Sequence, residues 1–197
     1  MRVTVIFIKD ARSKGFLRLG VEYNGEKYGF TVSESEYRAA GSPLTRDSLT
    51  QESFDILSDA DMRYRAKIKA LNILSYGDNS ERALRRKLSY AGFRADIIDE
   101  VACEMLSSGY INHDRQIKKL VLNEVNLRHS GPMKIIPKLV AKGYSKCDVT
   151  RIISELEDEG EIDFEESKRL LIESKLTATA NETDKKKLLY KNGYYVC

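Results

Sequence analysis

An internal repeat of 51 residues constrains the fold of this chain more than any other feature. A glycine followed by an aromatic residue occurs at Gly92-Phe93, at Gly143-Tyr144 and at Gly193-Tyr194, at intervals of 51 and 50 residues. A leucine stands four residues before each of these glycines. Periods of roughly this length are typical of proteins built from tandem helical units. We therefore expect copies of one helical unit that stack and share a core.

The same offset continues through the residues that follow each glycine. Each copy has room for three helices, and the third copy ends at Cys197, soon after its glycine, so we expect it to be truncated. The matched pairs are Ile98 and Val149, Val101 and Ile152, Met105 and Leu156, Gly109 and Gly160, and Ile111 and Ile162.

These patterns predict a mainly α-helical protein. The predicted architecture is a set of tandem three-helix repeats that form an elongated, curved solenoid, preceded by a small antiparallel β-hairpin or sheet subdomain. The predicted boundaries are 1–57 for the N-terminal subdomain, 58–112 and 113–163 for the two complete repeats, and 164–197 for the truncated third repeat.

The N-terminal stretch alternates between apolar and polar residues instead of following a helical period. Two such runs within residues 16–32 are joined by Asn24-Gly25, the preferred pair for a type I′ turn. With residues 3–8, this hairpin predicts a three-stranded antiparallel sheet. Ser33 and Glu36 then form a capping-box pattern that opens a short helix.

Helix boundaries can be assigned from caps and breakers. A second short helix is expected after Thr50, with the first repeat beginning near Ser58 and carrying a core stripe at Ile68, Leu71 and Leu74. Asn79 or Ser80 can cap the next helix, and Ile97, Ile98, Val101 and Met105 predict the core face of the third. In the second repeat Gly131-Pro132 marks a helix start, whereas Pro137 is expected to kink that helix.

Charge is segregated along the chain although the net charge is only +3. Residues 63–94 carry nine basic and two acidic side chains, whereas residues 95–114 carry five acidic and none basic. Residues 115–146 carry eight basic side chains and one acidic, and residues 147–166 carry nine acidic and one basic. The first two helices of each repeat are therefore expected to be basic and the third acidic.

Two interpretations of this segregation remain open. Oppositely charged helices could pack side by side and exchange surface ion pairs, each worth about 0–1 kcal/mol. Alternatively, the basic helices could form a stripe that lies against a polyanion or an acidic protein groove. The candidate binding residues of that stripe are Arg82, Arg85, Arg86, Lys87, Lys118, Lys119, Lys134, Lys138 and Lys142.

The sequence contains no catalytic constellation, and we expect no enzyme, no metal and no cofactor. There is no GxxxxGK[ST] phosphate loop and no GxGxxG motif. His113 and His129 lack a second ligand pattern, and the acidic run at 155–166 lacks the spacing of a calcium loop. The tyrosines one or two residues after a glycine of the repeat are expected to fill gaps between helices. They are Tyr110, Tyr144, Tyr194 and Tyr195.

The cysteine pattern and the hydropathy indicate the cellular compartment in which the protein is expected. Cys103, Cys147 and Cys197 form no CxxC pair, which favours buried or incidental thiols in a reducing cytosol. No apolar run reaches the length of a membrane span, and the first residues show no pattern of a signal peptide. We expect a cytoplasmic protein without membrane contact.

Three short motifs stand out along the repeats: Ser80, Glu81, Leu84 and Arg85, then the joint Gly109 to Asn112 with Asp114, and then Gly131-Pro132. Together these motifs resemble the RecX family of bacterial recombination regulators. The resemblance covers roughly residues 58–197, and the N-terminal hairpin is similar to a small extension seen in some members. Residues 133–137 depart from the Arg-rich stretch that often follows Gly-Pro in the family.

The resemblance implies a non-catalytic protein that binds the RecA recombinase filament on DNA, in its helical groove, and restrains ATP hydrolysis and strand exchange during recombinational repair. Its partners would be RecA and DNA within the filament. A solenoid with polar ends is compatible with a monomer, which is the state that we expect. A direct double-stranded DNA binder is the alternative, although the acidic third helix of each repeat would be repelled by phosphates. A scaffold for an unrelated acidic protein is a further possibility.

Overall fold

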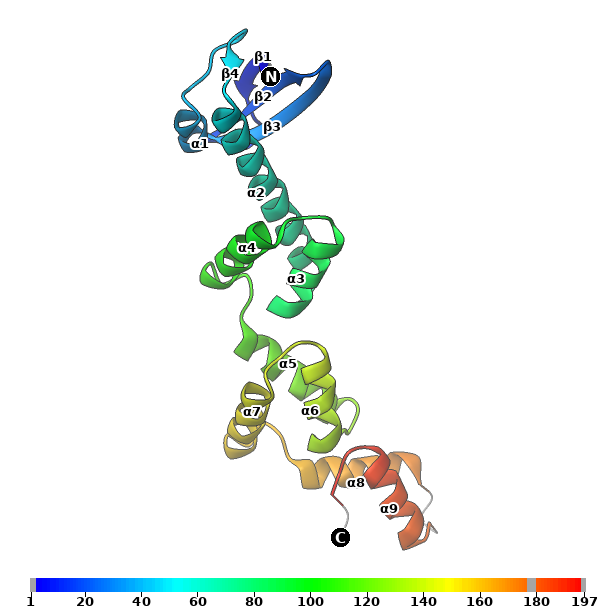
Figure 1. The fold of residues 1–197 in the computed structure, drawn as a ribbon. Coiled ribbons are helices and arrows are strands. Elements are labelled where there is room, and N and C mark those ends of the chain that lie inside the picture. The colour runs from blue at the N-terminus through cyan, green and yellow to red at the C-terminus, as the bar shows by residue number, and fades with distance from the viewer. Residues whose placement is uncertain (1–2, 177–179, 196–197) are drawn as a thin grey trace. The chain divides into compact units, whose positions relative to one another are not determined.

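The structure, a computed structural model, describes residues 3–176 and 180–195 and is mainly helical (Figure 1). It divides into two compact units, one formed by the chain up to Ser75 with Lys87–Glu104, the other by Tyr76–Arg86 with the chain from Met105 onward. The strands are β1 (Val3–Asp10), β2 (Phe16–Tyr23), β3 (Glu26–Ser33) and β4 (Ser48–Leu49). The helices are α1 (Glu34–Ala39), α2 (Gln51–Ser75), α3 (Glu81–Tyr90), α4 (Ala95–Ser107), α5 (His113–Asn126), α6 (Pro132–Ala141), α7 (Lys146–Asp158), α8 (Phe164–Lys175) and α9 (Glu182–Lys191).

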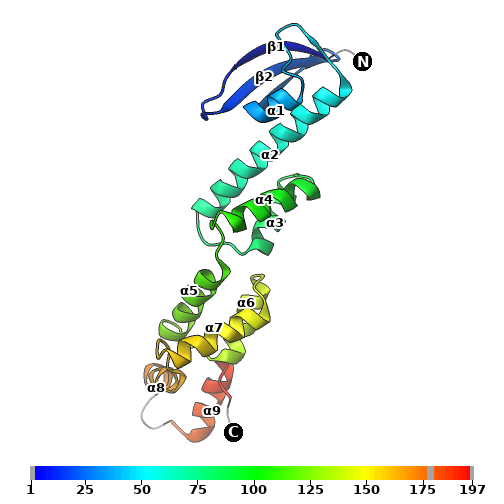
Figure 2. The ribbon, with the colours of Figure 1, turned by 90° about the vertical axis from the view of Figure 1, so that its left-hand side faces the viewer.

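The first unit contains an antiparallel sheet with strand order β3-β2-β1-β4. The predicted hairpin is confirmed, because β2 pairs with β3 and both Asn24 and Gly25 have the positive φ that a type I′ turn requires. The predicted three strands are joined by a fourth, the two-residue β4, which is too short for a sequence pattern to reveal. Figure 2 shows α1 and α2 on the same side of this sheet.

The short helix α1 begins as predicted. Ser33 and Glu36 form a complete capping box, in which the Ser33 side chain accepts from the Glu36 backbone N–H and the Glu36 carboxylate accepts from the Ser33 N–H. The buried face of α2 is then set by Leu57 and Ala60, which pack into the same core as the inward residues of the sheet.

The prediction of a separate short helix between Thr50 and the first repeat is wrong. Thr50 does open a helix, since its hydroxyl accepts from the Ser53 backbone N–H, but α2 continues unbroken for 25 residues. No glycine or proline interrupts it. The predicted stripe is also wrong at Ile68, which is 40% exposed, because the fully buried positions on this part of α2 are the small residues Ala66 and Ala70.

A buried carboxylate of α2 protects the open edge of the sheet. Asp61 accepts a hydrogen bond of 2.8 Å from the Thr31 backbone N–H on edge strand β3 and also pairs with Arg65 at 2.7 Å. Burial raises the pKa of Asp61, against the opposing influence of these two partners. The contact caps a backbone donor that would otherwise be available for pairing with another chain.

Arg94 ties α2 to the start of α4 through two carboxylates. Its guanidinium donates to Asp59 at 2.7 Å and to Asp96 at 2.6 Å. The hydrogen bond from Arg94 lowers the pKa of Asp96 to about 2. Because the pKa in the folded state lies below its ordinary value near 4, the stabilisation is complete above about pH 4 and is lost as pH falls through 2.

We therefore expect the urea midpoint of unfolding to fall between pH 4 and pH 2, and to fall less steeply in the variant Arg94→Gln. The measurement is urea unfolding followed by circular dichroism at several pH values for both proteins. Parallel pH profiles for the two would show that this contact does not couple stability to pH.

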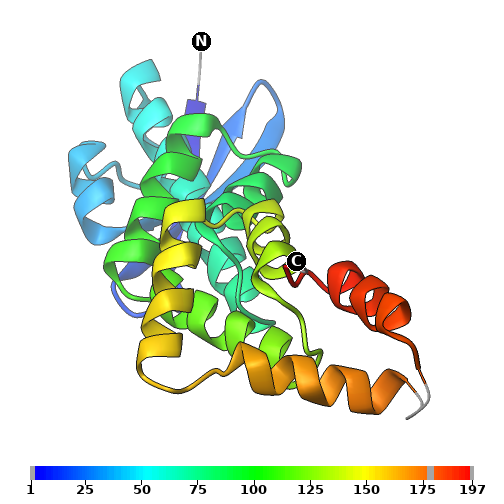
Figure 3. The same cartoon turned by 90° about the horizontal axis from the view of Figure 1, so that it is seen from below.

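The second unit has its own core, formed by α5, α6 and α7 with α8 and Tyr194 packed against it. A glycine with positive φ follows the end of several helices, at Gly109, Gly143, Gly160 and Gly193. Helix α6 begins at Pro132 as predicted and continues through Pro137. Figure 3 shows α8 and α9, in orange and red, as the last helical pair of this unit. The division into repeats at the predicted boundaries stays a prediction.

Candidate partner-binding surface

A serine fixes the start of α3 against the end of α6. The Ser80 hydroxyl accepts a hydrogen bond of 3.2 Å from the Ala83 backbone N–H, so that Ser80, and not Asn79, caps the helix. The same hydroxyl donates to the Lys142 backbone carbonyl at 2.6 Å. One side chain therefore satisfies an unpaired donor of one helix and an unpaired acceptor of another.

The close approach of these two helix ends depends on Gly143. A Cβ atom at this position would lie 2.8 Å from the Cβ atom of Arg82 and 2.8 Å from the Ser80 hydroxyl. Real Cβ atoms do not come this near to such neighbours. Glycine at this position thus permits both the positive φ at the end of α6 and the contact with α3.

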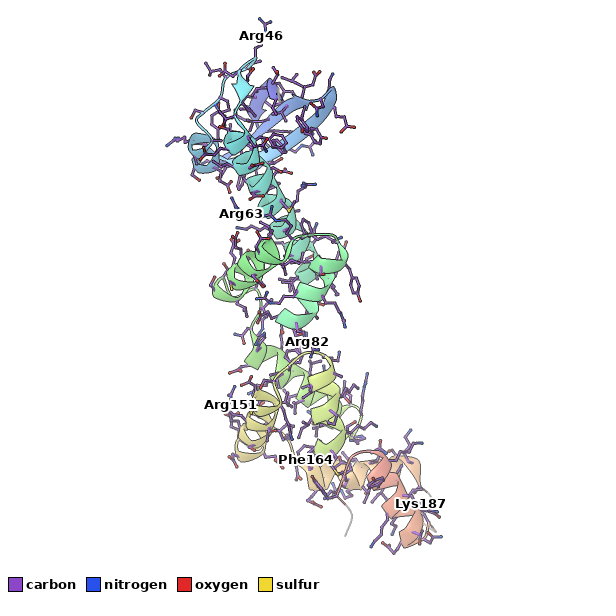
Figure 4. All side chains as sticks on the ribbon, viewed as in Figure 1. Arg46, Arg63, Arg82, Arg151, Phe164 and Lys187 are labelled. Atoms are coloured by element: carbon purple, nitrogen blue, oxygen red, sulfur yellow. The ribbon has the colours of Figure 1, made fainter. Side chains whose placement is uncertain are left out.

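Three of the predicted binding residues meet at this junction. Arg82 and Arg86 on α3 and Lys142 after α6 line a hollow of about 310 Å³, together with Ala83 and Ala141. Figure 4 labels Arg82 at the start of α3. All three basic side chains belong to exposed residues. Within residues 3–176 and 180–195, the structure gives none of the three a carboxylate partner.

The arrangement of charge in this hollow is unfavourable without a ligand. Arg82 and Arg86 are four residues apart on one helix, and like charges at this spacing destabilise a helix by about 0.2–0.5 kcal/mol. Lys142 adds a third positive charge at the same place. A bound anion would remove this repulsion, and guanidinium groups are well suited to phosphate and carboxylate. The hollow is the candidate binding site of the second unit.

The remaining predicted residues are more strongly engaged within the protein. Arg85 pairs with Glu81 at 2.7 Å, and Lys119 with Asp78 at 2.7 Å. Lys118 contacts Glu161 at 2.7 Å and Glu159 at 3.5 Å, and the hydrogen bond to Glu161 raises the pKa of Lys118. Lys138 pairs at 2.7 Å with Glu124, a buried carboxylate, and Lys134 donates to the Asn192 side chain at 3.1 Å. Lys87 is exposed on α3.

The first interpretation of the charge pattern, ion pairing between oppositely charged helices, is thus confirmed for several contacts. In the first unit Lys67 of α2 pairs with Glu104 of α4. In the second unit Lys118 of α5 contacts Glu159, the residue that caps the end of α7, at 3.5 Å. Under the second interpretation, the basic stripe would bind a partner mainly through those basic side chains that have no such ion pair in the part of the chain that the structure describes.

The joint between α3 and α6 has a counterpart between α6 and α9. The Gly131 N–H donates to the Asn192 carbonyl at 2.7 Å, and the Met133 N–H donates to the Gly193 carbonyl at 3.0 Å. A Cβ atom on Gly193 would lie 2.5 Å from the Lys134 backbone nitrogen. In both joints the start of one middle helix lies against the glycine turn that ends the next.

Two of the tyrosines after glycines are buried and hydrogen-bonded. Tyr144 donates to Gln116 at 3.1 Å, and Tyr194 donates to Ser167 at 2.9 Å. Gln116 and Ser167 are 51 residues apart, so the repeat itself was the signal that could have identified these polar partners. The prediction that all four tyrosines fill gaps is wrong for Tyr110 and Tyr195, which are 54% and 76% exposed.

The structure also shows where the candidate metal ligands and the cysteines lie. Across the residues that the structure describes, no group of three or more His, Cys, Asp or Glu could hold a metal ion. Cys103 and Cys147 are exposed rather than buried, and Cys197 lies outside the described residues. None of the helices in the described part of the chain is long and apolar enough to cross a membrane.

Comparison with known proteins agrees with this architecture. Residues 66–102 match the family model for the first three-helix domain of RecX. The regulatory protein RecX of Clostridioides difficile is 32% identical over 74% of this chain and 66% of its own length. RecX of Listeria monocytogenes (strain HCC23) is 27% identical over 86% of this chain and 64% of its length. The chain thus spans slightly less than two thirds of the length of these curated relatives.

Two solved structures share the fold. A crystal structure of regulatory protein RecX superposes with a TM-score of 0.73 at 18% identity, covering 98% of this chain and 95% of its own. RecX from Lactobacillus salivarius gives a TM-score of 0.58 at 21% identity, with 69% and 90% of the two chains covered. From the matching domain, the sequence relatives and the shared fold, we conclude that the chain belongs to the RecX family of regulatory proteins.

Proposed function

We propose that this chain binds the RecA recombinase filament on DNA and restrains its ATP hydrolysis and strand exchange. The proposal rests on family membership together with one observation, the hollow in which Arg82, Arg86 and Lys142 carry three positive charges without a carboxylate partner among the described residues. A surface of this kind is suited to acidic side chains of a protein filament or to the phosphates of the DNA that the filament encloses.

The mechanism that we propose is steric and electrostatic. A non-catalytic protein that bridges neighbouring protomers would hold them in one state and so slow the cycle of ATP binding and hydrolysis. The hollow would supply the ionic part of this contact. Lys118, Lys119 and Lys138 would contribute less, because a partner carboxylate would have to compete with Glu161, Asp78 and Glu124.

The direct test is DNA-dependent ATP hydrolysis by RecA with increasing amounts of this protein. We expect the steady-state rate to fall as the protein is added. A rate that is unchanged at a several-fold excess over RecA would contradict the proposal, provided that circular dichroism shows the added protein to be folded.

A second measurement separates filament binding from binding to bare duplex. Anisotropy of a labelled duplex is followed with and without RecA across a salt series. We expect tight binding only to the RecA-coated DNA. Tight binding to bare duplex with a steep salt dependence would instead support the direct DNA binder, because such a dependence reports the release of counterions from phosphates.

A further inference from the structure

The face of the β-sheet that turns away from the core carries an outward-facing aromatic ring. Val3 and Val5 are buried on the inner face, but the pairing of β1 with β2 shifts between Val5 and Phe7. Because of this bulge, Phe7 pairs with Gly20 and is 37% exposed, whereas Ile8 packs against the core. The bulge therefore turns the aromatic side chain to the open face.

Two paired glycines make the surface beside this ring flat. Gly20 on β2 pairs with Gly29 on β3. A Cβ atom on Gly20 would lie 2.6 Å from the Phe7 Cδ1 atom, so the ring lies across Gly20. A Cβ atom on Gly29 would have nothing closer than 4.0 Å, which leaves bare backbone next to the ring. A planar group could lie on this floor against the ring.

The neighbouring row of the same face is basic. Lys9 pairs with Arg18 across β1 and β2, and Arg18 pairs with Thr31 across β2 and β3. The Lys9 ammonium lies 5.2 Å from the centre of the Phe7 ring, within the range of a cation–π contact. The row thus places positive charge directly beside the aromatic surface.

A hollow of about 490 Å³ extends from this row to the edge of the sheet, where α2 forms one wall of it through Asp61, Tyr64 and Arg65. Its basic lining residues are Lys9, Arg12, Arg18 and Arg65, and its acidic ones are Asp10 and Asp61. Asp61 is already engaged by Arg65 and by the Thr31 N–H. Within the described part of the chain, Lys9, Arg12 and Arg18 have no carboxylate partner. The hollow therefore has unneutralised positive charge.

We propose that this open face of the sheet is a binding site for single-stranded nucleic acid. A base would stack on Phe7 above the Gly29 floor, and the adjoining phosphates would contact Lys9 and Arg18. An aromatic ring combined with a basic groove is the arrangement that recognises unpaired strands, since every base has a stacking face and every linkage a negative charge. The bases of a duplex are stacked on each other and could not reach the ring.

The test uses the full-length chain without RecA, so that its outcome is independent of the proposed function. A fluorescein-labelled oligothymidylate of about 15 nucleotides is titrated by anisotropy at several salt concentrations. The variants are Phe7→Leu, which keeps an apolar cover on Gly20, and the double change Lys9→Gln with Arg18→Gln. The matched control is Arg38→Gln with Arg46→Gln, two exposed arginines on α1 and in the loop before β4.

We expect Phe7→Leu to weaken binding about tenfold with an unchanged salt dependence, because stacking involves no charge. In the Lys9 and Arg18 double variant, the plot of log affinity against log salt should be less steep. The magnitude of its negative slope should fall by about 1.4, at about 0.7 for each lost phosphate contact. The control should bind like the wild type, and a duplex of the same length should bind more weakly than the single strand.

Wild-type affinity and salt dependence in the Lys9 and Arg18 double variant would overturn the proposal, and so would equal affinity for duplex and single strand. Because Phe7 covers Gly20, its variant is accepted only if its thermal unfolding midpoint matches the wild type. If that variant is unstable, photo-crosslinking of the wild type to an oligonucleotide containing bromodeoxyuridine replaces it. Crosslinks should then map to β1, and crosslinks confined to other elements would contradict the proposal.

Discussion

Reversing the three charges of the basic hollow, with Arg82→Glu, Arg86→Glu and Lys142→Glu in one protein, is expected to remove most of the inhibition of RecA. We expect at least about tenfold more protein to be needed for half-maximal inhibition of ATP hydrolysis, since three charge-assisted contacts would become repulsive. The fold should be retained, because all three residues are exposed and no carboxylate described in the structure depends on them.

The matched control reverses three other exposed basic residues of the same unit, with Arg115→Glu, Lys187→Glu and Lys191→Glu. Figure 4 labels Lys187 on α9. The control changes the net charge equally, so a similar loss of inhibition in both triple variants would indicate a general charge effect and contradict a role for the hollow. Full inhibition by the folded hollow variant would contradict it as well.

A neutral version of the hollow separates binding from stability. In Arg82→Gln with Arg86→Gln, the repulsion between the two guanidinium groups is removed, and we expect the protein to be as stable as the wild type or slightly more stable. Lys138 would not allow this separation. Its loss would leave Arg128 and the Ser130 hydroxyl as the described partners of the buried Glu124 carboxylate, at a cost in stability that would obscure any effect on binding.

The repeat was predictable from the sequence because its strongest signals are local. A glycine in a left-handed conformation ends a helix whatever surrounds it, so that Gly92, Gly143 and Gly193 mark three equivalent turns. The hairpin at Asn24-Gly25 was predictable for the same reason. The length of α2 was not, because the residues around Ser58 favour helix caps in isolation, whereas packing against the sheet carries the helix through them.

The candidate site was only partly predictable. The sequence indicates which residues are basic, but not which of them are neutralised, because their partners lie far away along the chain. Lys118 meets Glu161 after 43 residues, and Lys119 meets Asp78 after 41. Only the fold shows that, among the described residues, these lysines are ion-paired whereas Arg82, Arg86 and Lys142 are not. The contact between the ends of α3 and α6 brings the latter three together.

The second prediction with a large expected effect concerns the stability of the joint between α6 and α9. Gly193→Ala is expected to destabilise the docking of α9 by about 3 kcal/mol. Part of this cost arises because an L-residue at φ +86° is strained by roughly 1–2 kcal/mol. The rest arises because the new Cβ would lie 2.5 Å from the Lys134 backbone nitrogen, which cannot rotate away as a flexible side chain could.

Gly160→Ala is the matched control, since Gly160 also ends a helix with positive φ but has nothing within 4 Å of the position of a Cβ atom. Its free energy of unfolding should therefore fall only by the cost of the backbone strain, roughly 1–2 kcal/mol. Urea unfolding gives the overall stabilities, and hydrogen exchange of the α9 amides shows whether α9 detaches while the rest of the unit stays folded. Equal costs for the two substitutions would mean that the close contact at Gly193 does not stabilise the joint. A larger cost at Gly193, with faster exchange confined to α9, would show that a glycine-dependent contact between successive middle helices holds the repeats of this family member together.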